Sequence, residues 1–174
     1  SGANDLKLVS ATFYDETEPG GGDPNVGDGL VTSTRQYYGD GDANSYQTVS
    51  NYDFRGRLVK TRSHNRVASV RTLDNLGRAT AAETYEGATL DSGAITVAAA
   101  NLRAKSESLF DERGQVYRSI VHSVDANGTV GDANMISDMW YDAAGRQIKT
   151  VGPDGLIRKT AYNGVGNVLA EYLS

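Results

Sequence analysis

Oxygen-bearing side chains alternate with small residues between positions 40 and 45. Asp40, Asp42 and Asn44 stand at every second position of this segment. Calcium-binding loops present carboxylate and amide oxygens at such alternate positions. An EF-hand loop would also need glycine in place of Ser45 and a bidentate glutamate in place of Asn51. Asp40, Asp42 and Asn44 therefore form a candidate calcium site, and calcium is the one cofactor that the sequence suggests. The alternative is that Asp, Asn and Gly serve here only as turn residues. A looser cluster of the same kind contains Asp125, Asn127, Thr129 and Asp132.

The residue types needed for catalysis do not form a recognisable constellation. The two histidines, His64 and His122, are far apart in the sequence, and each has strand-like neighbours. The chain has no cysteine, no Gly-x-Ser-x-Gly elbow and no phosphate-binding glycine loop. Catalysis requires a positioned nucleophile, base or metal. We therefore expect a protein that is not an enzyme.

Tyrosine is abundant, with 10 residues against 3 Phe and 1 Trp. A tyrosine ring is flat and amphipathic, so an exposed ring can stack on a sugar while its hydroxyl remains solvated. Tyr37, Tyr38, Tyr46 and Tyr117 are the candidates for contacts with a glycan. The alternative is that these tyrosines are ordinary strand residues lining a half-buried face.

One short unit recurs along the chain and determines its organisation. It consists of an aromatic or large apolar residue, Asp or Asn, two variable residues, Gly and a long polar residue. Copies occupy positions 52–57, 73–78, 110–115, 141–146 and 162–167, at unequal intervals, and a degenerate copy begins at Tyr14-Asp15. The residues assigned to these repeat turns are Tyr52, Asp53, Gly56, Asp74, Gly77, Phe110, Asp111, Gly114, Tyr141, Asp142, Gly145, Tyr162 and Gly166.

The unit has the residue types of a tight β-hairpin turn. Asp at the first turn position accepts the backbone N–H two residues later, and Gly at the fourth adopts positive φ, which produces a bulge. The flanks, such as 116–124 and 156–162, are rich in the Val, Ile, Thr and Tyr that favour strands. The prediction is an all-β protein of consecutive antiparallel β-hairpins forming a spiral sheet, either an open barrel or a segment of a shell. The arginines after the turn glycines are expected to pair with carboxylates on neighbouring strands: Arg57, Arg78 and Arg146.

Composition and charge exclude several classes of function. With 39% hydrophobic residues and 20 glycines, the 174-residue chain suits a thin, wet β-structure better than a thick sandwich. The net charge of −5 and the scattered Lys and Arg residues give no basic face, so no nucleic-acid partner is expected. No apolar run approaches the roughly 18 residues of a membrane span, so no membrane insertion is expected.

The chain is expected to form one domain over residues 12–174, preceded by an extension over residues 1–11. The opening residues Ser1-Gly2-Ala3 resemble a cloning scar. The stretch 18–29, rich in Gly and Asp, is expected to be a mobile loop, and 98–105 is expected to hold at most one short turn of helix.

The repeated units resemble those of the YD-repeat (Rhs-type) family, named for the Tyr-Asp pair, over about residues 12–172. Tyr52, Asp53 and Gly56, like Tyr141, Asp142 and Gly145, match the motif fully, whereas Leu73, Phe110 and Asn163 are substitutions. In that family, hairpins join side by side into a spiralling shell that encloses toxins or forms adhesive ectodomains. The resemblance implies an extracellular or bacterial cell-surface location within a larger protein. The aspartic self-cleavage motif of toxin-bearing members is not found.

Two hypotheses about function follow. The first is a non-enzymatic scaffold module, whose partners are neighbouring repeats of a parent protein or copies of itself joined through sheet edges. The second is a carbohydrate- or protein-binding adhesion module that uses tyrosine-rich strands or Asp-rich loops. Concentration-dependent association favours the first, and saturable ligand binding by a monomer favours the second.

Overall fold

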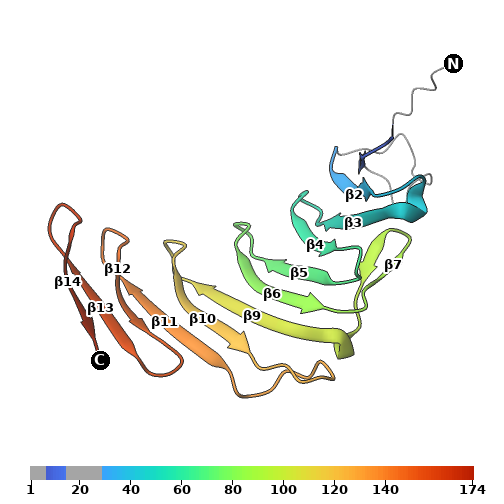
Figure 1. Ribbon diagram of the computed structural model, residues 1–174. Helices are drawn as coiled ribbons and strands as arrows, with labels where there is room; N and C mark the ends of the chain where they lie inside the picture. The colour runs from blue at the N-terminus through green and yellow to red at the C-terminus, as the bar shows by residue number, and fades with distance from the viewer. Residues whose placement is uncertain (1–6, 15–28) are drawn as a thin grey trace.

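The chain forms one long antiparallel sheet, which confirms the predicted all-β class (Figure 1). The computed structural model describes residues 7–14 and 29–174. Twelve strands pair in the order β1-β2-β3-β4-β5-β6-β9-β10-β11-β12-β13-β14, and β7 and β8 form a separate two-stranded sheet. The strands of the long sheet are β1 (Ser10–Tyr14), β2 (Val31–Tyr37), β3 (Ser45–Tyr52), β4 (Leu58–Arg62), β5 (Ala68–Leu73), β6 (Ala79–Tyr85), β9 (Leu102–Phe110), β10 (Val116–His122), β11 (Met135–Tyr141), β12 (Gln147–Val151), β13 (Ile157–Tyr162) and β14 (Val168–Leu173).

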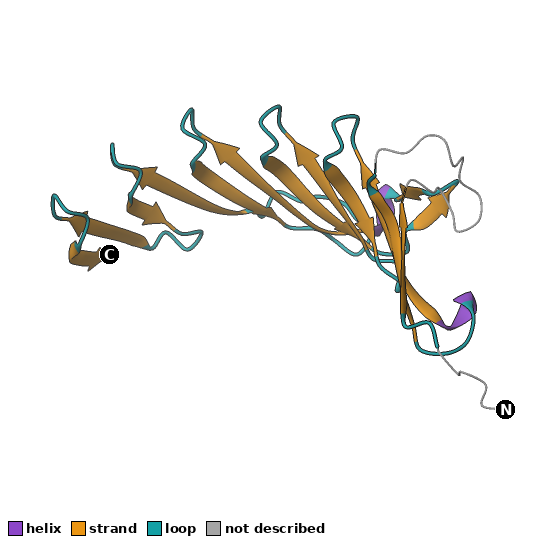
Figure 2. Ribbon diagram, turned by 90° about the horizontal axis from the view of Figure 1, so that it is seen from above, coloured by secondary structure: helices purple, strands orange, loops and turns teal. Residues whose placement is uncertain are grey.

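The sheet curves but stays open within the described residues. β1 and β14 are its two edge strands, and the strands follow one another in a curved row between them (Figure 2). The predicted open form therefore describes this chain, and closure into a barrel is not observed. Residues 1–6 of the predicted N-terminal extension and residues 18–28 of the predicted mobile loop lie outside the described residues.

The five repeat units all turn the chain at the same rim of the sheet (Figure 1). We call this the turn rim; it consists of residues 53–57, 74–78, 111–115, 142–146 and 163–167. Each unit has a register shift beside its first residue, as between Asn51 and Tyr52. The fourth turn position has positive φ in every unit, for example 82° at Gly114. Local turn chemistry therefore sets both the reversal and the bulge that accompanies it.

The sheet has a covered face and an open face. The short hairpin of β7 (Thr89–Asp91) and β8 (Ala94–Thr96) lies against β3 and β4 on the covered face, which carries Val49 and Lys60. Because side chains alternate along a strand, Thr48 and Thr61 lie on the open face. The hairpin covers only the N-terminal part of the sheet. Over the C-terminal strands both faces remain wet, and Trp140 is 42% exposed.

The hydrophobic core is correspondingly small. It consists of Val49, Ala68, Ala88 and Ile95, with Tyr85, Leu90 and Val97 packed against it. Large apolar side chains are otherwise widely exposed, and Leu169 on β14 is 67% exposed. The thin, wet architecture that the composition predicted is therefore observed.

The side-chain amide of Asn51 anchors the covering hairpin, because it binds the backbone of this hairpin as a neighbouring strand would. Its Nδ2 donates a hydrogen bond to the Gly93 carbonyl (3.1 Å), and its Oδ1 accepts one from the Ile95 N–H (2.6 Å). Lys60 Nζ donates to the Ile95 carbonyl (3.1 Å). A buried polar backbone group needs a partner, so these bonds allow Ile95 to enter the core.

Helical structure is limited to two short 3₁₀ turns in the described part of the chain, η1 (Asp42–Asn44) and η2 (Ala99–Asn101). The second is the single turn predicted for 98–105, and β9 begins directly after it. No helix among the described residues is long and apolar enough to cross a membrane.

Candidate functional site

Each repeat turn is organised around the carboxylate or amide of its first residue. In the first turn, Asp53 Oδ1 accepts hydrogen bonds from the backbone N–H groups of Arg55 (2.9 Å) and Arg57 (3.0 Å). Its other oxygen, Oδ2, accepts the guanidinium of Arg57 at 2.8 Å from Nε and 2.6 Å from Nη2. The same two-pronged pairing recurs in the turn that begins at Asp142, and in the turn that begins at Asp74 the Nε of Arg78 donates to Oδ2 at 2.6 Å. The turn is thus fixed by charge-assisted hydrogen bonds as well as by its backbone.

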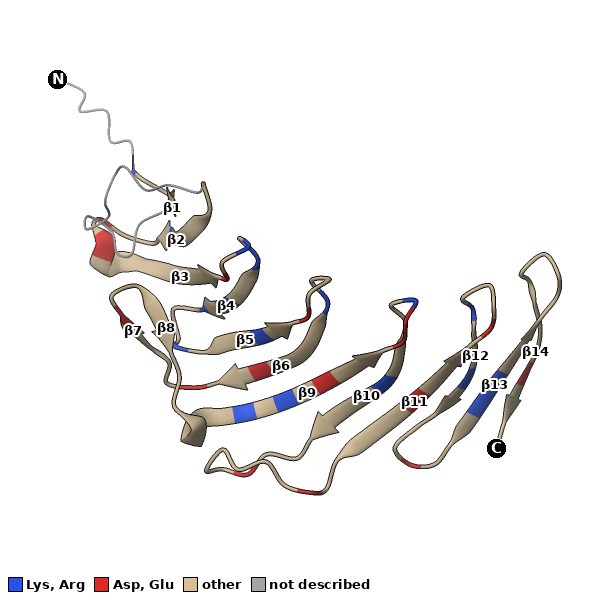
Figure 3. Ribbon diagram, turned by 180° about the vertical axis from the view of Figure 1, so that it is seen from behind, with Lys and Arg blue, Asp and Glu red and all other residues tan. Residues whose placement is uncertain are grey.

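The last side chain of each of the first four turns also reaches the next turn along the rim. Figure 3 colours Lys and Arg blue, and several turns of this rim carry them. Arg57 Nη1 donates to the carbonyl of Asp74 (2.7 Å). We call each such contact a stitch, because it ties neighbouring hairpins beyond their strand pairing. The other stitches run from Arg78 to the Asp111 carbonyl (3.5 Å), from Gln115 to the Gly145 carbonyl (2.9 Å) and from Arg146 to the Asn163 carbonyl (3.1 Å).

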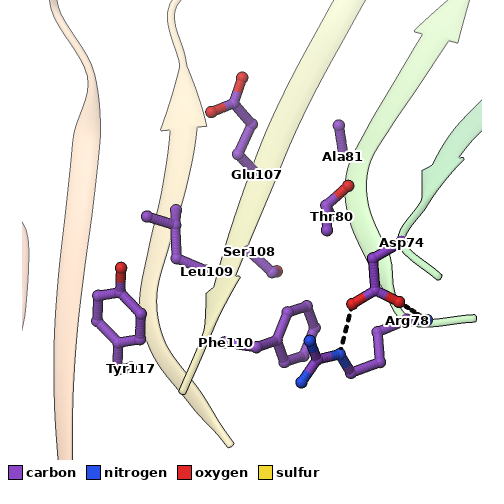
Figure 4. Close-up of a pocket in the computed structure, with 9 residues that line it drawn as sticks. All are labelled: Asp74, Arg78, Thr80, Ala81, Glu107, Ser108, Leu109, Phe110 and Tyr117. Atoms are coloured by element: carbon purple, nitrogen blue, oxygen red, sulfur yellow. Dashed lines mark hydrogen bonds and ion pairs between the residues drawn. The ribbon is translucent and has the colours of Figure 1, made fainter. Parts of the chain in front are cut away.

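Aromatic rings at the head of two units contact the arginines that reach them from the preceding turn. The guanidinium of Arg78 lies 4.6 Å from the centre of the Phe110 ring, and that of Arg146 lies 4.7 Å from the Tyr162 ring. Figure 4 shows Arg78 between its own Asp74 and the ring of Phe110. Such cation–π contacts favour the planar guanidinium over the ammonium of lysine.

A tyrosine at the head of a unit makes a hydrogen bond to the preceding hairpin, whereas the stitches run to the following one. The hydroxyl of Tyr52 donates to the Val31 carbonyl (2.9 Å), and that of Tyr141 donates to the Val116 carbonyl (2.9 Å). Tyr162 does the same to Gln147 (3.1 Å). In each case the acceptor lies near the start of the preceding hairpin's outgoing strand. Units headed by Leu73 or Phe110 have no hydroxyl and cannot make this bond.

The prediction for the partners of the turn arginines was wrong. Instead of carboxylates on neighbouring strands, Arg57, Arg78 and Arg146 bind the aspartate four residues earlier in their own turn and a carbonyl of the next turn. The bulge places the arginine beside its own aspartate, so the nearest carboxylate is local. Arg55 and Arg113, which the motif treats as variable positions, also reach carbonyls of the next turn.

The turn arginines shift the acidity of their aspartates. The hydrogen bond from the Arg57 side chain lowers the pKa of Asp53 from 3.8 to about 2, assisted by the backbone bonds of Arg57 and Arg55. The Arg146 guanidinium likewise lowers the pKa of Asp142. The last turn begins with Asn163 and ends with Asn167, so it has no ionisable pair.

Stability should therefore fall in acid as the turn rim is protonated. A carboxylate with a lowered folded-state pKa stabilises the protein fully above its unfolded value of 3.8 and loses that contribution as the pH falls toward about 2. Asp53→Asn should lower the free energy of unfolding above about pH 4 and flatten its pH dependence below that value. Urea titrations at a series of pH values measure both effects.

Asp154→Asn is the matched control for this prediction. Asp154 caps a turn through the Leu156 N–H (3.0 Å), and its turn continues with Leu156, not arginine. This variant leaves the pair of Asp53 and Arg57 in place, so it should keep the loss of stability in acid that Asp53→Asn reduces. An unchanged pH dependence in Asp53→Asn would contradict the proposed role of the rim pairs.

The structure places the predicted calcium ligands in and beside the η1 turn. The carboxylate of Asp42 binds the guanidinium of Arg35 and accepts the hydroxyl of Tyr37 (2.9 Å). The side chain of Asn44 donates to the backbone carbonyl of Asp40 (2.7 Å). The hydrogen bond from Arg35 lowers the pKa of Asp42. Asp42 therefore already neutralises a cation of the protein, and the calcium site stays a prediction. In the looser cluster, Asp125 Oδ1 accepts the N–H groups of Asn127 and Thr129 in a turn.

The two histidines lie apart. His64 lies in the exposed turn between β4 and β5, whereas His122 ends β10, with β6 and β9 between β5 and β10. His122 Nε2 is 3.3 Å from a carboxylate oxygen of Glu107, which also pairs with Lys105 (3.3 Å). No group of three His, Cys, Asp or Glu side chains that could hold a metal occurs within residues 7–14 and 29–174.

The candidate tyrosines separate into three locations. Tyr37 bonds to Asp42, and Tyr117 is 41% exposed beside the turn rim. Tyr38 and Tyr46 lie side by side, with ring centres 5.0 Å apart.

These residues define an open array of antiparallel hairpins, tied along one rim by side-chain bonds to the next turn. No protein-family model matches the sequence, and no match is found among curated proteins. Among solved structures, the chain is similar to a crystal structure of TcdB2-TccC3, with 14% identity and a TM-score of 0.47 over 84% of this chain. It is also similar to the Photorhabdus luminescens Tc holotoxin pore with a mutated TccC3, with 16% identity and a TM-score of 0.46 over 84% of this chain. The chain spans 8% of the length of each of those chains.

Proposed function

We propose that this chain is a non-enzymatic structural module, a segment of a YD-repeat (Rhs-type) wall in a larger secreted or bacterial surface protein. Its work is to extend a β-sheet from one hairpin to the next. The observation that carries the proposal is the series of stitches, because four of the five repeat turns contain a side chain that binds a backbone carbonyl of the turn after it. Binding or catalysis at a single site would not require such bonds at four successive interfaces.

The exposed edge of β14 supports the same role. Ile157 and Ser174 exchange both backbone hydrogen bonds. Because hydrogen-bonded pairs alternate along an antiparallel ladder, the backbone N–H and C=O groups of Tyr172 and Ala170 also point toward β13. The N–H and C=O groups of Glu171 then point away from the sheet. An open edge with exposed apolar side chains, such as Leu169 and Leu173, is a template for another strand.

Self-association of the purified chain tests this proposal. The weight-average mass in sedimentation equilibrium should rise with protein concentration. Glu171→Pro should abolish the rise, because proline removes an outward N–H while leaving the bonds to β13 intact. Glu171→Ala is the matched control and should associate like the wild type.

A wild-type chain that stays monomeric at every concentration would contradict strand addition at this edge. Equal association of the wild type and Glu171→Pro would place the contact elsewhere and would also count against the proposal. Circular dichroism of the proline variant checks that its sheet is retained.

A further inference from the structure

The third repeat turn differs from the other aspartate turns in the residue that follows its glycine. In the first, second and fourth turns this residue is arginine, and its guanidinium binds Oδ2 of the turn aspartate. In the third turn it is Gln115, whose amide is neutral. Asp111 Oδ1 still accepts the N–H groups of Arg113 (2.9 Å) and Gln115 (2.8 Å). No donor among the described residues reaches its other oxygen, Oδ2.

A cavity of about 370 Å³ lies between the third and fourth repeat turns. Its lining includes Asp111 and Gln115 from the third turn and Trp140 and Tyr141 from β11. Gln115 donates from Nε2 to the Gly145 carbonyl (2.9 Å), but its Oε1 is buried and accepts no hydrogen bond within the described residues. Buried polar atoms are almost always paired, so this oxygen and the carboxylate oxygen of Asp111 favour a ligand that donates hydrogen bonds.

The preceding hairpin interface shows which donor such a cavity takes. Its lining includes Asp74, Arg78 and Phe110, and the Arg78 guanidinium lies between the carboxylate and the ring (Figure 4). The corresponding residues one repeat unit later are Asp111, Gln115 and Tyr141. No cation among the described residues lies over the ring of Tyr141. A guanidinium from outside the chain would therefore meet a carboxylate, an amide oxygen and an aromatic face, as the planar guanidinium favours.

Other cations fit this cavity less well. Calcium takes about 6–8 oxygen ligands, whereas one carboxylate and one amide oxygen await a partner here. An ammonium lacks the planar fork of donors that can serve both oxygens at once. The nearby cations of the chain are held elsewhere, since Arg113 donates to the Ala143 carbonyl (2.9 Å) and Lys149 lies 4.2 Å from the centre of the Trp140 ring.

We propose that the cavity between the third and fourth repeat turns binds a guanidinium group from outside the chain. The group belongs either to an arginine side chain of a partner protein or to a small guanidino compound. Asp111 supplies the charge, Gln115 the second acceptor and Tyr141 the aromatic face. This inference does not depend on the wall-forming role, because the cavity lies within one copy of the chain.

The fluorescence of Trp140 measures this binding directly, because Trp140 lines the cavity and is the single tryptophan of the chain. Methylguanidinium, added at constant ionic strength, should change the emission saturably with a Kd on the order of 1 mM. Methylammonium is the matched probe and should bind at least tenfold more weakly. A blocked Gly-Arg-Gly peptide should bind as tightly as methylguanidinium if the ligand is an arginine of a protein. Binding of the peptide at least tenfold weaker would instead assign the site to small guanidino compounds.

Two variants of the third turn test the assignment of the residues. Asp111→Asn should weaken the binding of methylguanidinium by roughly tenfold, because it removes the charge. The turn itself should persist, since Asn163 caps the last turn through the equivalent pair of backbone N–H groups. Gln115→Arg places a guanidinium in the cavity from within the chain and should abolish binding.

Asp125→Asn is the matched control, because Asp125 caps its turn in the same way as Asp111 but lies outside the cavity. It should bind like the wild type, and so should Glu171→Pro, which separates this test from that of edge pairing. The proposal is overturned if methylguanidinium gives no saturable change, or if methylammonium binds equally well. Unchanged binding in Gln115→Arg, with its circular dichroism like that of the wild type, would also overturn it.

Discussion

Replacing Ile95 with alanine should lower the free energy of unfolding by about 2–5 kcal/mol. Ile95 is 2% exposed and is the largest fully buried side chain in the described residues. It fills the contact between the β7–β8 hairpin and β3, so its truncation leaves a cavity in a core that has few other members. Urea unfolding followed by circular dichroism measures the loss.

Ile136→Ala is the control for this prediction. Ile136 is on the covered face of β11, beyond the reach of the hairpin, and it is 40% exposed. The same truncation there should cost less than about 1 kcal/mol, because little apolar surface is lost from contact. Equal losses for the two variants would show that the hairpin does not provide the core.

Gly128→Ala should lower the free energy of unfolding by at least about 2 kcal/mol, for two separate reasons. Gly128 has φ of 79°, a conformation that a residue with a Cβ adopts at a cost. A Cβ at this position would also overlap the carbonyl oxygen of Ala99 and lie 2.8 Å from the carbonyl carbon of Ala100. The β10–β11 connection would have to move away from the η2 turn.

Gly155→Ala isolates the first of these costs. Gly155 has φ of 81°, and a Cβ there would meet no atom within 4 Å. This variant should lose only about 1–2 kcal/mol. The difference between the two variants measures the packing of the long connection on η2, and a difference near zero would contradict that packing.

The hairpins could be predicted from the sequence because their determinants are local. Asp53, Gly56 and their counterparts lie within a few residues of the groups they bind, so residue type and spacing are enough. The strand ends predicted beside the turns agree closely with the structure, as at Val116 and Tyr162. The all-β class followed directly from five such turns.

Contacts between distant segments could not be predicted in the same way. Asn51 binds Ile95, 44 residues away, and nothing in a polar strand residue signals that partner. The pairing of Asp42 with Arg35 also depends on how β2 and β3 align, so the loop alone resembled a cation site. The sequence also does not show which face of the sheet is covered. Ser, Thr and Ala occur on both faces, which weakens the alternation of apolar and polar residues that would mark a core.

The two rims of the sheet differ in how far the lengths of their connections can vary. The three arginine stitches each join the last residue of one turn to the first carbonyl of the next, so a change of length at the turn rim would break these bonds. The connections at the opposite rim do not repeat one turn geometry and differ in length. There the chain passes from β4 to β5 and from β12 to β13 through short turns, but from β6 to β9 through the whole β7–β8 hairpin. Insertions of that kind explain why the repeat units recur at unequal intervals. Lineages of such proteins can therefore acquire new loops, and engineers can graft them, at one rim without disturbing strand order.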